Sequence, residues 1–439
     1  MFGYYLDLAL RSLKRSPGLT ALMVLSVGIG VALAMSTWTL VHLMTRDPLP
    51  QKSAQIYFPT IDGLGPAWHA TANIGDEPPD RLDYSTAMAL LRDHRATYQS
   101  AIYLISATVT PRRQDQYPFN VVGYAVTDEF FSMVDVPFEH GSGWSSADEA
   151  GAAQVAVITA QLSESLFGPG NSVGRTLVVN GRVYRVVGVL SNWNPQPVFF
   201  DIDGVQGLNG FATHPTELYL PFNTAVAAGL EPHGGKGCYK QPKTSSFMDL
   251  QSSNCAWLSY MVQLNTPTAA QSYKNYLEGL ARQRFSWPPN IRLRDLPAWL
   301  AYQQVVPDSF KMLHLIGVGL LIVCLVDTIG LLLAKFLRRS GEIGVRRALG
   351  APRRAIYAQF LTEAALIGGV GGVLGIIFTW LAVAWIRAKY PSQWEPLAQL
   401  NSGLLALTLA VAIAATLLAA LYPVWRAANV QPAWQIKSN

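Results

Sequence analysis

The sequence predicts a membrane protein with four transmembrane α-helices and a large α+β domain inserted between the first and second of them. Three observations lead to this fold class. Half of the 439 residues are hydrophobic and only 14% are charged, which is low for a soluble protein. Four apolar runs are long enough to cross a bilayer. Residues 45–308, between the first and second runs, are rich in Pro, Gly, Asn and aromatic side chains and contain no apolar stretch of that length.

The charge of the chain is unevenly distributed. Between Thr45 and Asp308 there are 18 Lys and Arg against 23 Asp and Glu, a net charge of −5. The rest of the chain has 15 basic and 5 acidic residues, a net charge of +10. Basic residues beside apolar runs follow the positive-inside rule. The excess positive charge therefore indicates a membrane protein, and no basic patch interleaved with aromatics suggests a nucleic-acid partner.

The N-terminal part is predicted to be a surface helix followed by the first span. Residues 1–18 form a basic amphipathic pattern and are expected to lie on the inner membrane surface, in contact with lipid. Residues 19–44 are the first predicted span. A signal peptide is the alternative, because Ala32-Leu33-Ala34 resembles a cleavage site. The apolar run continues beyond that point, which favours a retained anchor.

Residues 45–308 are predicted to form an α+β domain with mixed sheets, with an inserted subdomain over roughly 120–225. The clearest local element is a hairpin over 176–189. Its two β-rich runs are joined by Asn180-Gly181, and both residues accept the positive φ that such a tight turn requires.

Two of the three cysteines, Cys238 and Cys255, lie in this domain, 17 residues apart. In an oxidising compartment they are expected to pair; two free thiols are the alternative. Cys324 falls inside the second span, where it is expected to be a buried, unreactive side chain.

The other three spans are predicted over residues 309–336, 361–387 and 404–425. With an inside N-terminus, the α+β domain and the short loop 388–403 lie outside. The connection 337–360 and the tail 426–439, which carries Arg426 and Lys437, then lie inside. Five glycines in the third span permit close helix contact: Gly368, Gly369, Gly371, Gly372 and Gly375.

The connection between the second and third spans carries six arginines in the seventeen residues Arg338–Arg354. Glu342 and Arg346, at i and i+4, favour a short helix. Gly350 is placed to end that helix and Pro352 to start the next one. An apolar stripe at helical spacing completes the pattern: Val345, Leu349, Pro352 and Ile356. Such an element could press against a soluble partner.

No arrangement typical of catalysis or metal binding is found in the sequence. Residues 170–174 match G-x-S-x-G, but the expected order there is helix, turn, strand, and a nucleophile elbow requires strand, turn, helix. The histidines and cysteines lack zinc-site spacing. No lysine completes a P-loop, so ATP hydrolysis is expected to come from a partner. We therefore predict neither a catalytic nor a metal site.

Asp327 is the one acidic residue deep inside a predicted span. A charge there costs about 2.5–3.5 kcal/mol, so the side chain is expected to face other helices and find a partner. It serves either a proton relay or, as we favour, packing between helices. Glu363 is interpreted as an acid at the start of the third span.

The segment Gly341–Ala351, Gly-Glu-Ile-Gly-Val-Arg-Arg-Ala-Leu-Gly-Ala, is similar to the intracellular E-I-G-x-x-[RK]-A-x-G-A signature of ABC permeases of the macrolide-exporter (MacB-like) and FtsX type. Residues 422–428 resemble the end of that family's last span. In the exported domain, residues 128–131, 164–168 and the hairpin to Val189 resemble the family's periplasmic core.

The resemblance implies a multi-pass protein of the bacterial inner membrane, with its large domain in the periplasm. It implies a dimer with a second permease, identical or homologous, bound to two copies of a separate ATPase that holds ATP and Mg²⁺; this chain itself would bind no cofactor. The expected function is efflux, with a periplasmic adaptor and outer-membrane channel as further partners. Mechanical signalling of the FtsX type and lipoprotein release are the alternatives. The coupling helix would use eight residues: Glu342, Ile343, Gly344, Arg346, Arg347, Leu349, Gly350 and Ala351.

Overall fold

The computed structural model describes residues 2–72, 75–111, 117–191, 193–202, 204, 207–208, 210–212, 214–238, 240–242, 244, 246–389 and 402–428. The chain divides into two units. We call Met1–Thr45 with Val306–Asn439 the helical bundle, and Arg46–Val305 the α+β domain. The tail residues 429–439, with Lys437, and most of the predicted loop 388–403 lie outside the described residues.

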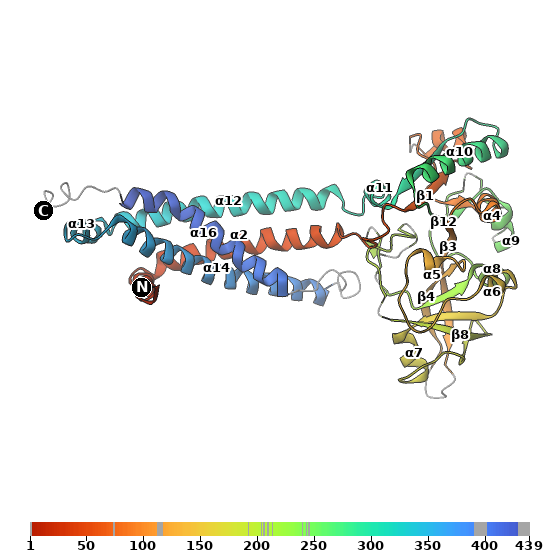
Figure 1. Cartoon of the computed structure of the whole chain (residues 1–439), viewed down its shortest axis with the longest axis horizontal. Helices are drawn as coiled ribbons and strands as arrows, with labels where there is room; N and C mark the ends of the chain where they lie inside the picture. The colour runs from red at the N-terminus through yellow and green to blue at the C-terminus, as the bar shows by residue number, and fades with distance from the viewer. Residues whose placement is uncertain are drawn as a thin grey trace. The chain divides into compact units, whose positions relative to one another are not determined.

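In the residues that the structure describes, the helical bundle consists mainly of four long helices and has two shorter ones (Figure 1). Its helices are α1 (Phe2–Arg15), α2 (Pro17–Met44), α12 (Asp308–Leu337), α13 (Ser340–Ala348), α14 (Arg353–Lys389) and α16 (Ser402–Ala428). Among the described residues, α2, α12, α14 and α16 are long and apolar enough to cross a membrane. The four predicted spans and the domain inserted after the first of them are therefore confirmed.

Small residues allow these helices to approach closely. α2 packs against both α12 and α14, and α16 packs against α14 and α12. At Gly368 in α14, an added Cβ would lie 2.9 Å from the carbonyl oxygen of Ala412 in α16 and would overlap the Thr416 hydroxyl. At Gly30 in α2, it would lie 3.1 Å from Cβ of Cys324. Cys324 is buried and free, as expected.

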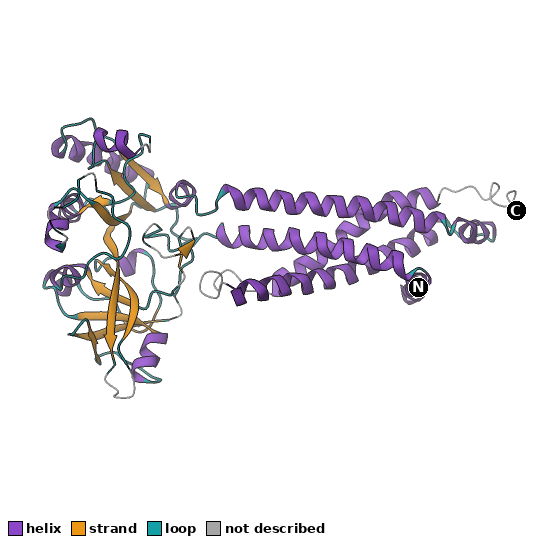
Figure 2. Cartoon of the chain, turned by 180° about the vertical axis from the view of Figure 1, so that it is seen from behind, coloured by secondary structure: helices purple, strands orange, loops and turns teal. Residues whose placement is uncertain are grey.

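The α+β domain contains one large mixed sheet and a small two-stranded one (Figure 2). Its strands are β1 (Ile56–Ile61), β2 (Leu82–Asp83), β3 (Tyr98–Thr110), β4 (Phe119–Val126), β5 (Phe138–Gly141), β6 (Val155–Thr159), β7 (Thr176–Val179), β8 (Arg182–Leu190), β9 (Gly207–Leu208), β10 (Phe211–Ala212), β11 (Leu218–Pro221), β12 (Ala256–Gln263) and β13 (Ile291–Asp295). Its helices are α3 (Pro66–Ala72), α4 (Tyr84–Asp93), α5 (Phe130–Met133), α6 (Ser146–Ala150), α7 (Ala160–Phe167), α8 (Phe222–Ala227), α9 (Phe247–Ser252), α10 (Pro267–Arg284) and α11 (Leu296–Tyr302).

The strand order β13-β1-β12-β3-β4-β11-β6-β8-β5 separates two parts of the chain. β4, β11, β6, β8 and β5 all come from residues 119–221, whereas β13, β1, β12 and β3 come from the segments on either side. The pairs β4–β11 and β6–β8 are parallel and the other pairs are antiparallel. The hairpin β7–β8 turns at Asn180 and Gly181, whose φ angles are 46° and 76°, as its sequence predicts.

Glu149, in α6, is a buried carboxylate within this domain. It accepts hydrogen bonds from the Trp144 indole Nε1 at 3.0 Å and from the Asn223 backbone N–H at 2.8 Å. Burial outweighs these bonds and raises the pKa of Glu149 from 4.5 to about 7. Between those two values the folded domain holds a proton that the unfolded chain has released. The contribution of Glu149 to stability therefore falls as the pH rises through this window.

We expect Glu149→Gln to remove this pH dependence. From pH 4 to pH 8, the unfolding free energy of the variant minus that of the wild type should increase by about 3 kcal/mol, because only the wild type loses the contribution of Glu149. Denaturant unfolding of the full chain in detergent, followed by tryptophan fluorescence, measures it. Glu164→Gln, the same change at an exposed position, is the control and should alter the unfolding free energy by less than about 0.5 kcal/mol. A constant difference for Glu149→Gln would contradict the assignment.

Candidate functional site: the junction of α12, α13 and α14

The short helix α13 follows α12 almost directly and ends before Gly350. The backbone carbonyl of Arg339 accepts a hydrogen bond from the Ile343 N–H at 3.1 Å, which starts the helix. Gly350 has φ of +92°, a left-handed conformation that favours glycine and ends the helix. α14 begins at Arg353, immediately after Pro352. The structure thus places a helix, an elbow and a second helix where the sequence predicts them.

One face of α13 is buried and the other is open. Ile343 packs into a cluster with Phe336, Ile356 and Phe360, and Gly344 is also buried. On the opposite face the apolar side chains of Val345 and Leu349 are 60% and 83% exposed. Beside them Glu342, Arg346 and Gly350 are exposed and Ala351 is half-buried, while the side chain of Arg347 lies outside the described residues.

The two charged residues expected to pair within α13 bond elsewhere. Glu342 Oε1 lies 3.0 Å from Nη1 of Arg15, at the end of α1. Arg346 Nη1 donates to Oε1 of Gln359 in α14 at 3.0 Å. Neither partner is near in sequence, so the spacing of Glu342 and Arg346 could not reveal them. These exposed contacts connect α13 to α1 and α14, but each is individually weak.

A buried ion pair lies where α12 and α14 meet next to α13. Lys335 Nζ lies 2.5 Å from Glu363 Oε1, with side chains 2% and 0% exposed. The interpretation of Glu363 as a helix-start acid is wrong: α14 begins ten residues earlier, so this carboxylate lies about 15 Å along the helix. The sequence contained one signal of this pair: Glu363 is an acidic residue within one apolar run, and Lys335 is a basic residue within the run before it.

A second cation reaches the same carboxylate through a hydroxyl. Ser12 Oγ, from α1, donates to Glu363 Oε1 at 2.6 Å. Arg339 Nη1 donates to Ser12 Oγ, and its Nη2 donates to the Ser12 carbonyl at 3.1 Å. Within the described residues, Glu363 Oε2 is buried and has no hydrogen-bond partner. We call Ser12, Lys335, Arg339 and Glu363 the junction cluster.

Asp327 does not face the other helices, contrary to expectation. It lies on the exposed face of α12, together with Gly319, Val323, Val326 and Gly330. Cys324, three residues before Asp327, and Thr328, directly after it, are buried on the inner side of α12. The distribution of apolar residues is too uniform along α12 for the sequence to indicate which face is inside.

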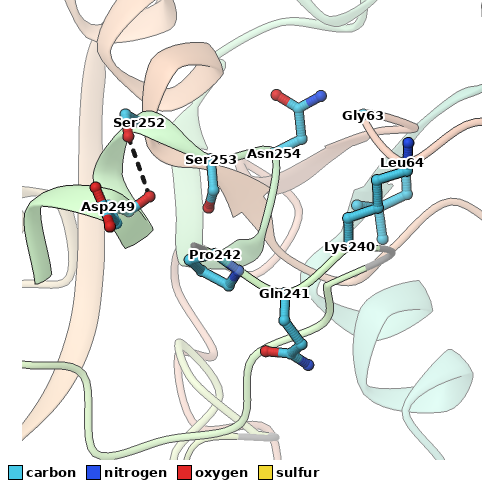
Figure 3. A pocket seen from close by; sticks show the side chains of 9 residues that line it. All are labelled: Gly63, Leu64, Lys240, Gln241, Pro242, Asp249, Ser252, Ser253 and Asn254. Carbon is cyan, nitrogen blue, oxygen red and sulfur yellow. Dashed lines mark hydrogen bonds between the residues drawn. The ribbon is translucent and has the colours of Figure 1, made fainter. Parts of the chain in front are cut away.

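The α+β domain contains a pocket of about 400 Å³ (Figure 3). Its lining is mostly polar, with one base, Lys240, and one acid, Asp249. The hydroxyl groups of Ser252 and Ser253 donate to the backbone carbonyls of Asp249 and Leu250 at 3.1 and 2.7 Å. Both hydroxyls thus satisfy backbone carbonyls at the end of α9.

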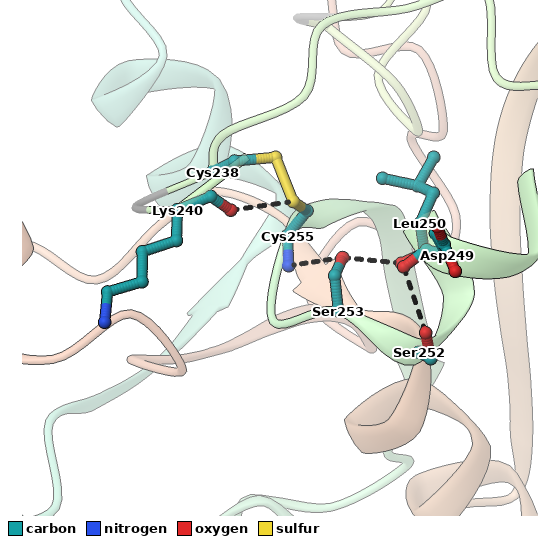
Figure 4. Close-up of a disulfide and its surroundings, with 7 residues drawn as sticks. All are labelled: Cys238, Lys240, Asp249, Leu250, Ser252, Ser253 and Cys255. Carbon is teal, nitrogen blue, oxygen red and sulfur yellow. Dashed lines mark hydrogen bonds between the residues drawn. A yellow bond between two sulfur atoms is a disulfide. The ribbon is translucent and has the colours of Figure 1, made fainter. Parts of the chain in front are cut away.

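Beside this pocket, Cys238 and Cys255 are joined by a disulfide (Figure 4). The bond ties the loop before α9 to the start of β12. The backbone N–H of Cys255 donates to Ser253 Oγ at 3.2 Å. These contacts indicate a structural role for this corner of the domain.

Other candidate residues are held in structural contacts. Ser172, in the G-x-S-x-G match, is buried against the hydroxyl of Ser163 and follows a helix, so it is not a nucleophile elbow. His69 Nε2 pairs with Asp62 at 2.9 Å and its Nδ1 contacts the Gly75 carbonyl. In the part of the chain that the structure describes, no three His, Cys, Asp or Glu side chains converge on a metal position.

Two family matches together cover most of the chain. Residues 20–280 match the MacB-like periplasmic core domain, and residues 314–432 match the FtsX-like permease C-terminal domain. This chain is a MacB-like, FtsX-type ABC permease. The second match contains α13 and the junction cluster residues Lys335, Arg339 and Glu363. The permease is a multi-pass membrane protein with a periplasmic domain.

Individual relatives are distant. The permease is 24% identical to the probable syringafactin export ATP-binding/permease protein SyfD of Pseudomonas syringae pv. tomato, over 76% of this chain and 45% of that protein. It is 24% identical to the uncharacterized ABC transporter permease YvrN of Bacillus subtilis, over 70% and 68%. It is 25% identical to the macrolide export ATP-binding/permease protein MacB of Aggregatibacter actinomycetemcomitans, over 58% and 34%.

The permease spans about a third to a half of the length of the two exporters. Among solved structures, the periplasmic region of MacB from Actinobacillus actinomycetemcomitans aligns with 61% of this chain and 96% of its own, at 14% identity and a TM-score of 0.35.

The buried ion pair makes a stability prediction. Lys335→Met should destabilise the permease by about 3–5 kcal/mol, because it leaves Glu363 buried without its cation. Adding Glu363→Leu should restore most of this loss, because an apolar pair needs no desolvation of charge. Denaturant unfolding in detergent measures both. Lys311→Met, at an exposed pair with Asp308, is the control and should change stability by less than about 1 kcal/mol.

Proposed function

We propose that this permease works with an ABC ATPase on a separate chain and that α13 is the helix on which that ATPase docks. The observation that carries the proposal is the open face of α13. Val345 and Leu349 are large apolar side chains exposed on a short helix between two spanning helices, flanked by Glu342 and Arg346. An apolar centre with a charged rim is typical of a protein interface. ATP and Mg²⁺ would be held by the partner.

The proposed orientation follows from charge. The α13 end of the bundle carries the arginines of the α12–α14 connection, so it lies in the cytoplasm of a bacterial cell, with the α+β domain in the periplasm. ATP binding by two docked ATPase copies would then move α13, and the spanning helices would carry that movement across the inner membrane. No transport path through the bilayer is required for such a mechanism.

We propose efflux as the purpose of this movement. Its support is the names of relatives, which are exporters of syringafactin, pyoverdine and macrolides. The substrate would be taken from the periplasm or the inner membrane, with an adaptor and an outer-membrane channel as further partners. Deletion of the permease should then raise retention of the substrate in the cell, whereas a purely mechanical signalling role would leave efflux unchanged.

ATPase docking is tested by changing the open face of α13. We expect a tagged wild-type permease, purified from its own host, to carry ATP-hydrolysing activity with it. Val345→Asp with Leu349→Asp should reduce this co-purified activity at least about tenfold, because each charge would be buried in an apolar contact. Met248→Asp is the control: Met248 is also apolar and 77% exposed, but lies in the α+β domain. Equal activity in the double variant would exclude α13 as the docking helix.

We also propose that a second permease covers the open face of α12. An unpartnered Asp327 facing lipid is costly, whereas Gly319 and Gly330 on the same face leave space for another helix. In a parallel pair of identical helices, the two Asp327 side chains would lie at the same depth, away from lipid.

Cysteine cross-linking in membranes tests this face. In a Cys324→Ser background, Val326→Cys should give a disulfide-linked dimer on mild oxidation, because both copies would present it to each other. Leu332→Cys, on the buried face of α12, is the matched control and should stay monomeric. A monomer in both variants would contradict an α12–α12 contact, and a link to another protein would indicate a different second permease.

A further inference from the structure

The junction cluster connects two helices that are far apart in sequence. Ser12 is in α1, near its C-terminal end, and Arg339 directly precedes α13. Arg339 makes two contacts to Ser12, one to the hydroxyl and one to the backbone carbonyl. The main chain of Arg339 also accepts the first hydrogen bond of α13, from Ile343. One residue therefore holds α1 with its side chain and starts α13 with its backbone.

Glu363, in α14, contacts residues on both sides of the Ser12–Arg339 connection. It is paired directly with Lys335 of α12, which is four residues before Arg339. It also accepts from the Ser12 hydroxyl, which is the group that Arg339 contacts. Lys335 and Ser12 thus contact one carboxylate that has no exposure to solvent, and Arg339 reaches it only through the Ser12 hydroxyl. In such surroundings hydrogen bonds and ion pairs are stronger than at the surface.

We propose that Arg339, Ser12 and Glu363 are positioning residues that make α1 and α13 move as one unit. α1 is then part of the coupling apparatus and not only a helix resting on the membrane. This consequence rests on the proposed docking of an ATPase on α13, but the connection between the two helices does not. A movement imposed on α13 would be passed to α1 through Arg339, and to α14 through Glu363.

The contacts of Arg339 with Ser12 are supplemented at the surface by the ion pair of Arg15 with Glu342. Replacing those two residues by cysteines and attaching spin labels removes this pair and reports the distance between α1 and α13. A Cys324→Ser background leaves no other free thiol, since Cys238 and Cys255 are bonded to each other. The purified full-length permease in nanodiscs, without any ATPase, is the sample.

We expect a single narrow distance distribution in this labelled permease. Arg339→Gln should at least double its width, because it removes both contacts to Ser12. Ser12→Ala should widen it in the same direction but less, because the carbonyl contact remains. Arg338→Gln is the matched control: the same change one residue earlier, at an exposed position, should leave the distribution unchanged.

A purely structural role predicts another result. Arg339→Gln would then lower the melting temperature and leave the distance distribution as narrow as in the wild type, and this result would overturn the proposal. If Arg339→Gln fails to fold, Ser12→Ala decides between the same two outcomes. Failure of ATPase co-purification would contradict the proposed function and leave this connection intact. Co-purification with an unchanged distribution in the variants would support the function and refute the connection.

Discussion

Glu363 has no exposed surface, and a carboxylate in such a place is stable only with a cation and hydrogen-bond donors around it. Lys335 and Ser12 supply these, and they bring the ends of α12 and α1 to α14. The position of α13 follows, because Arg339 both contacts Ser12 and begins that helix. These contacts position α13, and with it the open face that carries Val345 and Leu349.

Asp327 is a second acidic side chain within an apolar helix of the bundle, but unlike Glu363 it is exposed. Asp327 lies on the face of α12 that no other helix of this chain covers among the described residues. Glu363 has its cation, Lys335, within the chain, whereas we propose that Asp327 is covered by a second permease. The difference separates a contact that holds one permease together from one that would join it to another. At both positions an unpaired charge away from water is costly.

The α+β domain is organised around one large sheet and a disulfide-bonded corner. Its sheet is continuous, yet one half comes from residues 119–221 and the other from the flanking segments. Next to the pocket, the two cysteines form a disulfide. The neighbouring serine hydroxyls donate to backbone carbonyls at the end of α9.

The sequence by itself determined the four spans, the inserted domain, the hairpin at Asn180-Gly181 and the short helix ending before Gly350. These follow from apolar length, residue periodicity and local turn chemistry, which act between near neighbours. Only the tertiary structure decided that Glu363 pairs with Lys335, that Glu342 meets Arg15 instead of Arg346, and that Asp327 faces outward. In a span that is apolar on all sides, no periodicity marks the inner face. Which helices meet, and therefore which charges pair, is fixed by packing between segments that are 28 residues apart for Lys335 and Glu363 and 327 apart for Arg15 and Glu342.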